Sequence, residues 1–548
     1  MYLINGPSFF SEFKKNNNLA QTSFHMNRLI YFTIFILLCA PAMYAQVSPA
    51  IKITAAIRNE GSCFGNSVSI DASYAVVGVS KPWYLGDDPG SAIIFERDAG
   101  GSWNQIQILT PSDIQPGDHF GTFTAISGNY IVVSAPFADS IGQDSTLINA
   151  GAVYVFERNS GGVWQQVIKI RASDAHSYDI FGHVALHGKY LVVGSYNDYD
   201  ANEMNYKDAA GAVYVFERTD GGEWLPVQKL TASDRASGNL FNQVAVDGYT
   251  KTIVVGAPGV VGANPAPQSG AAYVFKRDAS GNWNETQKLT SSAPIHTALF
   301  GSSVDINGSW ILIGASHDYY TENDVWNGNN QKGAAYLFED NGAGSWIQKR
   351  KICAHDGYAS DEFGRSVSLD GNYAVIGSEG MADENHQNLL SESGSAYLYE
   401  RNGSTWSLKK KLVAPDRSYY DQFGWSVSIS GAQVMIGAID EGPENQYGGY
   451  LAEYGSAYIF NILNPLGMEE SDLNSVNVYP NPTDGNLTIS GEELFTELLL
   501  MDVTGKILNQ TSLSPSGMVS YSIDQPEGVY FLKITAGKSS VIKKILVR

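Results

Sequence analysis

The sequence predicts an all-β protein: a ring of seven four-stranded sheets, a seven-bladed β-propeller, followed by a small β-sandwich. Three observations lead to this prediction. A Phe-Gly pair, once Phe-Asn, recurs about every 60 residues. Four short strand patterns follow each recurrence, and a segment near the N-terminus matches the strand that the last repeat lacks. The recurrences begin at Phe64, Phe120, Phe181, Phe241, Phe300, Phe363 and Phe423.

The sixth repeat illustrates the four expected strands. Residues 363–369 alternate bulky and small side chains, and a tight turn joins them to a second strand at 373–377. A long polar loop leads to a third strand at 394–399, and a short turn leads to a fourth at 406–412. We expect the small side of the first strand to face the axis of the ring, where only small residues admit the Phe of a neighbouring blade.

The last repeat has no fourth strand, because the chain passes from Phe460 directly to Asn464 and Pro465. Residues 51–55 match residues 228–232, a fourth strand, and lead into the next Phe at the same distance. The N-terminal segment therefore supplies the outer strand of the last blade. Such closure leaves only short outer edges and removes the need for capping repeats.

The repeat also carries a family resemblance. Its Phe-Gly start, the Gly-Ala-Pro at 256–258 and a Gly-x-x-Tyr-x-Phe third strand resemble the FG-GAP repeats of integrin-type β-propellers, from about residue 50 to residue 464. Members of that family often carry an Asp-rich calcium loop between the first two strands. Here that connection is a short hairpin, as at 126–130, too short to surround a cation that needs six or more oxygens. No calcium site is therefore carried over from the family.

The two ends of the chain indicate export. Residues 26–45 have the basic start, short apolar run and cleavage pattern of a signal peptide, and the run is too short for a membrane anchor. Residues 1–25 are interpreted as an extension from a misplaced start codon. We then expect the propeller at 46–464, a polar linker at 465–475 and a C-terminal domain at 476–548.

The C-terminal domain alternates in short strands, which predicts a small β-sandwich. Its motifs resemble the type A sorting domain of the type IX secretion system. That resemblance implies passage from the periplasm through the outer membrane of a Gram-negative bacterium by the type IX machinery. The protein would then be secreted or stay on the cell surface, where attachment to lipopolysaccharide is one fate. The residues that carry it are Tyr479, Pro480, Asn481, Pro482, Gly505, Lys506, Gly528, Tyr530, Lys543 and Lys544.

Composition excludes several classes of protein. Hydrophobic residues make up 43% of the chain, so it is not compositionally disordered. Asp and Glu number 56 against 35 Lys and Arg, a formal charge of −21, so we expect no nucleic-acid partner. A cation or a neutral ligand suits this charge better. Outside the leader only Cys63 and Cys353 remain, which cannot build a disulfide framework or a CxxC zinc site.

The loops between second and third strands are the predicted binding surface. They should open on the same rim as the connections between blades, and they are rich in acidic and aromatic residues. Aromatic rings there could stack on sugars or anchor a protein partner; alternatively, the loops pack on one another and their charges are solvated. The ligand-binding candidates are Trp83, Tyr84, Tyr196, Tyr199, Tyr319, Tyr320 and Trp326.

Calcium is the one cofactor that the sequence suggests. Asp198, Asp200 and Asn202 have the alternate spacing of a calcium loop, although the glycine and distal Glu of an EF-hand are missing. A second acidic pattern lies two residues before the repeated Phe, where Asx turns or a ring of ligands are the two interpretations. This pattern comprises Asp118, Asp179, Asp361 and Asp421, with Asn239 in the fourth repeat.

No GxSxG, HExxH or P-loop motif occurs, so the sequence predicts a protein that is not an enzyme. The leading hypothesis is an adhesion or recognition protein that binds glycan or protein through the loop-rich rim. One alternative is a secreted polysaccharide-degrading enzyme whose carboxylates or histidines converge at the mouth of the channel. A structural surface-layer component is the third.

Overall fold

The structure of the chain is a computed structural model. It describes residues 47–57, 61–80, 89–142, 146–197, 207–261, 269–292, 297–318, 332–357, 360–380, 390, 392–442, 454–462, 476–481, 483–501, 507–536 and 539–547. The predicted extension at 1–25, the signal peptide at 26–45 and the linker at 465–475 lie outside these residues. The part of the chain that the structure describes contains no helix long and apolar enough to cross a membrane.

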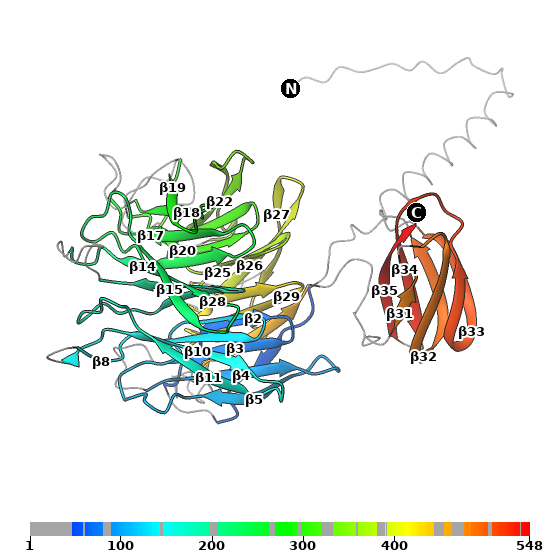
Figure 1. Cartoon of the computed structure of the whole chain (residues 1–548), viewed down its shortest axis with the longest axis horizontal. Helices are drawn as coiled ribbons and strands as arrows, with labels where there is room; N and C mark the ends of the chain where they lie inside the picture. The colour runs from blue at the N-terminus through cyan, green and yellow to red at the C-terminus, as the bar shows by residue number, and fades with distance from the viewer. Residues whose placement is uncertain are drawn as a thin grey trace, which may run out of the picture.

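Seven four-stranded antiparallel sheets form the first part of the described chain, numbered here as blades 1 to 7 (Figure 1). Blade 1 contains β2 (Phe64–Asp71), β3 (Tyr74–Val79), β4 (Ser91–Arg97) and β5 (Trp103–Leu109), and blade 2 contains β6 (Thr124–Ser127), β7 (Tyr130–Ala135), β10 (Ala152–Arg158) and β11 (Trp164–Ile170). Blade 3 contains β12 (His183–His187), β13 (Tyr190–Ser195), β14 (Ala212–Arg218) and β15 (Trp224–Leu230), and blade 4 contains β16 (Gln243–Asp247), β17 (Thr252–Ala257), β18 (Ala271–Arg277) and β19 (Trp283–Leu289). Blade 5 contains β20 (Phe300–Asn307), β21 (Trp310–Ala315), β22 (Ala334–Asp340) and β23 (Trp346–Ile352), and blade 6 contains β24 (Val367–Asp370), β25 (Tyr373–Ser378), β26 (Ser395–Asn402) and β27 (Thr405–Leu412). Blade 7 contains β28 (Phe423–Ser430), β29 (Gln433–Ala438), β30 (Ser456–Asn461) and β1 (Ile51–Ile53), and a short hairpin, β8 (Ser140–Ile141) and β9 (Thr146–Leu147), extends from blade 2.

The N-terminal strand completes blade 7, as the sequence predicted. β1 pairs antiparallel with β30, so that Ile51 lies opposite Ile459 and Ile53 lies opposite Ala457. Ser48 and Asn461 extend the pairing, because each backbone N–H of this pair donates to the other residue, at 2.8 and 2.9 Å. In Figure 1 the blue start of the ring lies beside β28 and β29 of its last blade.

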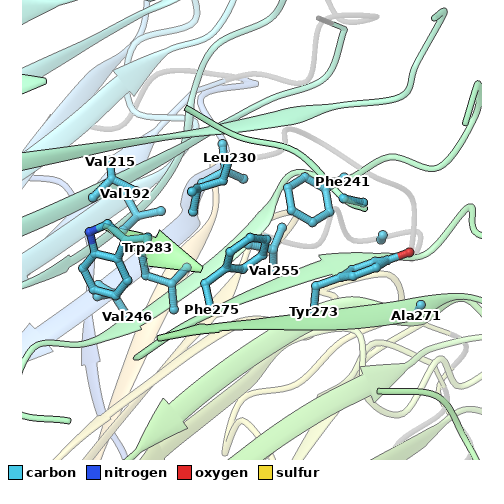
Figure 2. Packing of buried hydrophobic residues seen from close by; sticks show 14 of the residues in the cluster. Val192, Val215, Leu230, Phe241, Val246, Val255, Ala271, Tyr273, Phe275 and Trp283 are labelled. Carbon is cyan, nitrogen blue, oxygen red and sulfur yellow. The ribbon is translucent and has the colours of Figure 1, made fainter. Parts of the chain in front are cut away.

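Apolar cores lie between neighbouring blades rather than at one centre. Figure 2 shows the core of blades 3 and 4, in which Val192 and Val215 come from blade 3 and Val255 from blade 4. The repeated Phe241 packs edge-on against Tyr273 and Phe275 of its own blade, with ring centroids 5.4 and 6.0 Å apart. Because each core is shared by two blades, each blade depends on its neighbour for burial of its apolar surface.

The glycine after the repeated Phe has a reason that differs from the expected one. Gly364 has φ +93°, and a side chain there would meet the backbone oxygen of Ala334 at 2.2 Å. Gly314 of blade 5 lies against the same residue, since a Cβ on Gly314 would be 1.9 Å from the oxygen of Gly364. Two backbones therefore touch at this point, so the small residues admit the neighbouring backbone and not the neighbouring Phe.

The hairpins between first and second strands are bonded to one another around the ring. At five interfaces the side chain before the turn accepts a hydrogen bond from the N–H of the turn glycine in the next blade. We call these contacts the hairpin ring. Written with the accepting side chain first and the donating glycine second, they are Asp71 and Gly128 (2.6 Å), Ser127 and Gly188 (3.0 Å), Asp247 and Gly308 (2.6 Å), Asn307 and Gly371 (3.3 Å), and Asp370 and Gly431 (2.6 Å). At the closure Ala72 N–H donates to Ser430 Oγ at 3.3 Å.

The C-terminal domain is a single five-stranded sheet that surrounds its own apolar core. Its strands are β31 (Asn477–Tyr479), β32 (Asn486–Met501), β33 (Ile507–Ser522), β34 (Gly528–Ala536) and β35 (Ser539–Val547). β32 pairs with β31, β33 and β34, and its register shifts at two points between Ser490 and Glu497. All five strands contribute to or flank one buried cluster, which includes Phe495 and Leu532.

Candidate functional site

The loops between second and third strands share one face of the ring with the connections between blades, as predicted. In blade 2, Ile148 accepts a hydrogen bond from Tyr178 N–H at 2.7 Å, and Asn149 accepts one from Ile180 N–H at 3.1 Å. Tyr178 and Ile180 belong to the connection that enters blade 3. We call this face, made of these loops and connections, the loop rim. The hairpin ring lies at the other ends of the same strands.

A repeated Lys–Asp–Tyr cluster ties five of the described connections to the next blade. In blade 3, Tyr214 Oη donates to Asp174 at 2.7 Å, and Lys229 pairs with the same carboxylate while lying 5.3 Å from the Tyr214 ring centroid. Asp174 follows the last apolar residue of the preceding fourth strand by four positions. Sequence reasoning missed this cluster, although that spacing recurs at Asp113, Asp234, Asp356 and Asp416.

Burial of the Lys–Asp–Tyr cluster varies around the ring. Asp356 and Lys411 are almost fully buried and lie 2.6 Å apart, whereas both members of the 2.5 Å pair between Asp234 and Lys288 are largely exposed. Burial pushes the pKa of Asp356 up, but hydrogen bonds from Lys411 and Tyr397 outweigh it, so the pKa lies below its usual value. The buried clusters therefore hold charged carboxylates as fixed parts of the frame.

The acidic residues before the repeated Phe form Asx-type turns. Oδ2 of Asp118 accepts from Gln115 N–H at 2.9 Å, and that of Asp179 accepts from His176 N–H at 2.6 Å. Asp421 repeats the contact with Ser418 N–H at 2.5 Å. All three are buried. Within the described residues no group of three or more His, Cys, Asp or Glu side chains is placed to hold a metal ion.

One of the predicted ligand-binding residues can be placed on the loop rim. Tyr196 follows β13, donates its N–H to Asp179 O at 2.8 Å and exposes its side chain. The other candidates, Trp83, Tyr84, Tyr199, Tyr319, Tyr320 and Trp326, lie outside the described residues. So do all three calcium candidates, Asp198, Asp200 and Asn202.

Two exposed tyrosines that the sequence analysis missed lie in connections between blades. Tyr178 and Tyr420 each stand three residues before the repeated Phe, with φ of 69° and 68°. The same position holds Gly117 and Gly238 in other repeats, also with positive φ. The signal in the sequence was a Tyr-Asp pair at a position where the other repeats have a glycine, Thr297 or Ser360.

Charged residues meet where blades 5, 6 and 7 adjoin the loop rim. Arg365 bonds both Glu362, at 3.1 Å, and Glu379, at 2.8 Å, and its guanidinium lies 3.7 Å from the ring centroid of Trp425. His317 Nε2 lies 3.7 Å from the other oxygen of Glu362. We call these five residues the carboxylate pair cluster.

The two carboxyl groups of this cluster differ in protonation. Burial, and then the charge of neighbouring Glu362, raises the pKa of Glu379 to about 8. Burial also pushes the pKa of Glu362 up, but His317 and Arg365 outweigh it and lower the pKa. At neutral pH we therefore expect Glu379 to carry a proton beside an ionised Glu362. Hydrolytic carboxyl pairs stand about 5–10 Å apart, so this contact differs from that arrangement.

His183 and His187 have packing partners inside the ring. The His183 ring lies 4.1 Å from the Phe123 ring, and burial lowers its pKa to about 4, so it is neutral at physiological pH. His187 packs edge-on against Tyr249 at 4.7 Å. These contacts favour structural histidines over channel ligands.

Two cavities lie on the outer circumference of the ring. One of about 430 Å³ separates β11 from β15, and one of about 210 Å³ separates β27 from β1. Other interfaces are bridged there by a glutamine: Gln107 donates to Trp164 O at 2.7 Å and accepts from its N–H at 3.0 Å. Ile168 takes the glutamine's place beside the larger cavity.

Parts of the sorting signal that are distant in sequence meet in the C-terminal domain. Asn481 Oδ1 accepts from Leu546 N–H at 2.9 Å, so the opening motif contacts the last strand, which carries Lys543 and Lys544. Tyr530 is buried and donates to Pro526 O at 2.8 Å. Tyr479 is exposed, Pro480 joins it to Asn481, and Gly528 begins β34. Pro482, Gly505 and Lys506 lie outside the described residues.

The chain belongs to the FG-GAP repeat family. The family model matches six times and covers more than half of the chain, at residues 103–156, 164–216, 224–275, 283–338, 346–399 and 406–460. Each match runs from a fourth strand to the third strand of the next blade. A model described as a secretion system C-terminal sorting domain matches residues 477–548. The protein is thus a secreted β-propeller with a type IX sorting tail, which is released or displayed at the cell surface.

Solved structures with weak similarity add no functional argument. A Lactobacillus plantarum protein is 13% identical (TM-score 0.41), with 67% of this chain and 89% of that one covered. The periplasmic gluconolactonase PpgL of Pseudomonas aeruginosa is 15% identical (TM-score 0.39), with 65% and 86% covered. Sqt1 of Saccharomyces cerevisiae is 9% identical (TM-score 0.37), with 90% and 98% covered. No curated protein matches the chain.

Proposed function

We propose that this secreted β-propeller is a recognition protein that binds a glycan or a protein through its loop rim. The observation that carries the proposal is the exposure of tyrosines on that rim, at Tyr178, Tyr196 and Tyr420. Tyrosine gives large contact area for little loss of side-chain entropy, and it is enriched at binding surfaces. The repeated contacts between blades hold the backbone beneath these side chains, so the surface is formed before the ligand arrives.

Binding of the full chain to glycan and matrix-protein arrays tests this proposal. One variant replaces residues 140–147, the β8–β9 hairpin of the rim, by a short Gly-Ser linker. The control is Tyr249→Ser, because Tyr249 is a highly exposed tyrosine in a hairpin at the opposite ends of the strands. We expect binding by the wild type and the control and weaker binding by the rim variant. Absence of binding on both arrays would contradict the proposal.

The C-terminal domain is assigned the role of directing type IX secretion, with lipopolysaccharide as an attachment partner after export. Deletion of residues 476–548 should leave the propeller in the periplasm. Fractionation and surface labelling of cells measure this directly, and normal surface display of the truncated chain would remove the assignment.

A polysaccharide-degrading enzyme is the second candidate. The difference in pKa between Glu379 and Glu362 favours it, whereas their close contact does not match the spacing of hydrolytic carboxyl pairs. A protonated Glu379 beside an ionised Glu362 offers an acid and a base on the rim. Release of reducing ends from a broad polysaccharide panel, lost in Glu379→Gln, would support an enzyme. The same panel without turnover would eliminate it while leaving the recognition proposal intact.

A further inference from the structure

Tyr178 and Tyr420 occupy one position of the repeat, three residues before the Phe, in blades that lie three apart around the ring. We propose that they are two equivalent stacking surfaces for the sugar rings of a neutral, linear polysaccharide. This inference rests on the proposed function, since it names the ligand class and two contact residues of the same rim.

Backbone conformation gives the first reason. A residue other than glycine in the left-handed region is disfavoured, because its Cβ crowds the following carbonyl. Gly117 and Gly238 show that the repeat accepts glycine at this position, with φ of 89° and 79°. Thr297 and Ser360 hold the same position with φ of 60° and 65°, so the connection also accepts small non-glycine side chains there. The backbone therefore does not require a large, partly exposed ring at Tyr178 and Tyr420.

Exposure gives the second reason. The side chains of Tyr178 and Tyr420 are 52% and 42% exposed, and Tyr196 beside the first is 38% exposed. Asn197 Nδ2 donates to Tyr178 O at 2.9 Å, and Tyr196 N–H donates to the next carbonyl, that of Asp179. The two tyrosines of blade 3 thus share one hydrogen-bonded patch of the rim.

Rigidity of the backbone gives the third reason. Tyr178 N–H donates to Ile148 O at 2.7 Å, and the following Asp179 is buried in its Asx turn. On the other side of the ring, Asp421 makes the same turn, and Gln422 N–H donates to Glu392 O at 2.8 Å. An aromatic ring on such a fixed backbone loses little conformational entropy when a ligand stacks on it.

The repetition of the tyrosine contact indicates the class of ligand. Two copies of one contact on a rigid ring favour a ligand that itself repeats, because the second contact then forms at high effective concentration. A polymer of identical sugar units can make the same contact with both tyrosines. The formal charge of −21 disfavours polyuronates and sulfated polymers, which leaves neutral glycans.

The test uses glycine substitutions in the full chain. Tyr178→Gly, Tyr420→Gly and the double variant remove the rings at positions where glycine is the relaxed residue. The probes are the soluble neutral polymers laminarin and glucomannan, with alginate as the charged comparison, measured by calorimetry and affinity electrophoresis. Ser360→Gly is the matched control, because Ser360 holds the same backbone position with φ of 65° and carries no ring.

We expect wild type and Ser360→Gly to bind a neutral polymer equally. Each tyrosine variant should bind about tenfold more weakly and the double variant about a hundredfold, with a melting temperature equal to or above that of wild type. Unchanged affinity in the tyrosine variants would overturn the assignment of these residues. Binding only to alginate, or only to proteins on the array, would overturn the ligand class and leave the proposed function standing. Binding to nothing would remove both.

Discussion

The two faces of the ring differ in what repeats. On the hairpin face, the same side-chain position accepts a bond from the same backbone position of the next blade, at Asp71, Asp247 and Asp370 alike. On the loop rim, the residues that recur are those that fix the connections between blades, namely the Asx-turn residues and the Lys–Asp–Tyr clusters. The loop residues between them differ from blade to blade in number and in chemical type. Sequence is therefore constrained where a side chain touches the next blade's backbone. Elsewhere the rim is free to carry side chains for binding.

Substitution of a glycine at a contact between two blade backbones should cause the largest loss of stability in the ring. In Gly314→Ala the new Cβ would stand 1.9 Å from the backbone oxygen of Gly364, so one blade must move. We expect a loss of about 3 kcal/mol or more in the free energy of unfolding, measured with urea. Gly308→Ala is the comparison, because Gly308 has φ +58° and open space around it. It should lose about 1 kcal/mol, and equal losses in the two variants would contradict the contact argument.

The Lys–Asp–Tyr clusters allow the same substitution, Asp to Asn, to be compared in a buried and in an exposed cluster. Asp356→Asn leaves buried Lys411 without its counter-charge, which should remove about 3 kcal/mol from the free energy of unfolding. Asp234→Asn breaks the exposed counterpart with Lys288 and should remove about 1 kcal/mol or less. If both variants lose the same amount, burial is not what distinguishes the clusters.

The carboxylate pair cluster should make stability depend on pH. The pKa of Glu379 is raised to about 8, first by burial, whereas its ordinary value is 4.5. Its favourable contribution is complete below about pH 4.5 and is lost as the pH rises through 8. Asp305 and Asp421, with pKa raised to about 7 by burial, act in the same direction.

Glu379→Gln cannot ionise, so its free energy of unfolding should fall less steeply between pH 5 and pH 8 than that of wild type. Urea unfolding at four pH values measures the slope. Glu223→Gln, in an exposed turn, is the control and should follow wild type. A Glu379→Gln curve parallel to wild type would show that this carboxyl does not titrate in the range.

The smallest expected effect is a gain in stability from a substitution on the outer circumference of the ring. Gln228 of blade 3 bonds the backbone of Trp283 twice, at 2.9 and 2.8 Å, whereas Ile168 of blade 2 cannot bond Trp224. Ile168→Gln should restore the bridge, fill part of the cavity and add about 0.5–1 kcal/mol to the free energy of unfolding. A loss of stability would mean that the aliphatic side chain at position 168 contributes more than the bridge.

Much of the fold was predictable because it depends on local patterns that repeat. The fourth strand expected at 406–412 is observed at Thr405–Leu412, and the displaced strand β1 is where the matching segment placed it. The β8–β9 hairpin was not predicted, because its strands are two residues long and their sequence shows no alternation of apolar and polar residues. The expected reason for the glycine after each Phe, that it admits a neighbouring Phe, was also wrong in part. The glycine admits a neighbouring backbone, and a contact between two backbones leaves no pattern of side chains in the sequence.

The candidate site was less predictable for two physical reasons. Tyr178 and Tyr420 stand out only through the exposure of their rings on the loop rim, which the sequence does not reveal. Glu362, Arg365 and Glu379 are brought together by different segments of blade 6, so their contact depends on how the chain folds. Tyr196 was found because it lies in an aromatic loop. The other aromatic and calcium predictions fall on residues that the structure does not describe and stay predictions.

The bond between Asn461 and Ser48 spans 413 residues of sequence. A chain that leaves a translocation channel from its N-terminus onward would release β1 long before its partner β30. Until β30 follows, β1 would stay apart from the other three strands of blade 7, and the interface between the first and last blades would stay open. Closure of the ring therefore requires both ends of the propeller, and a chain that stops before β30 leaves β1 unpaired.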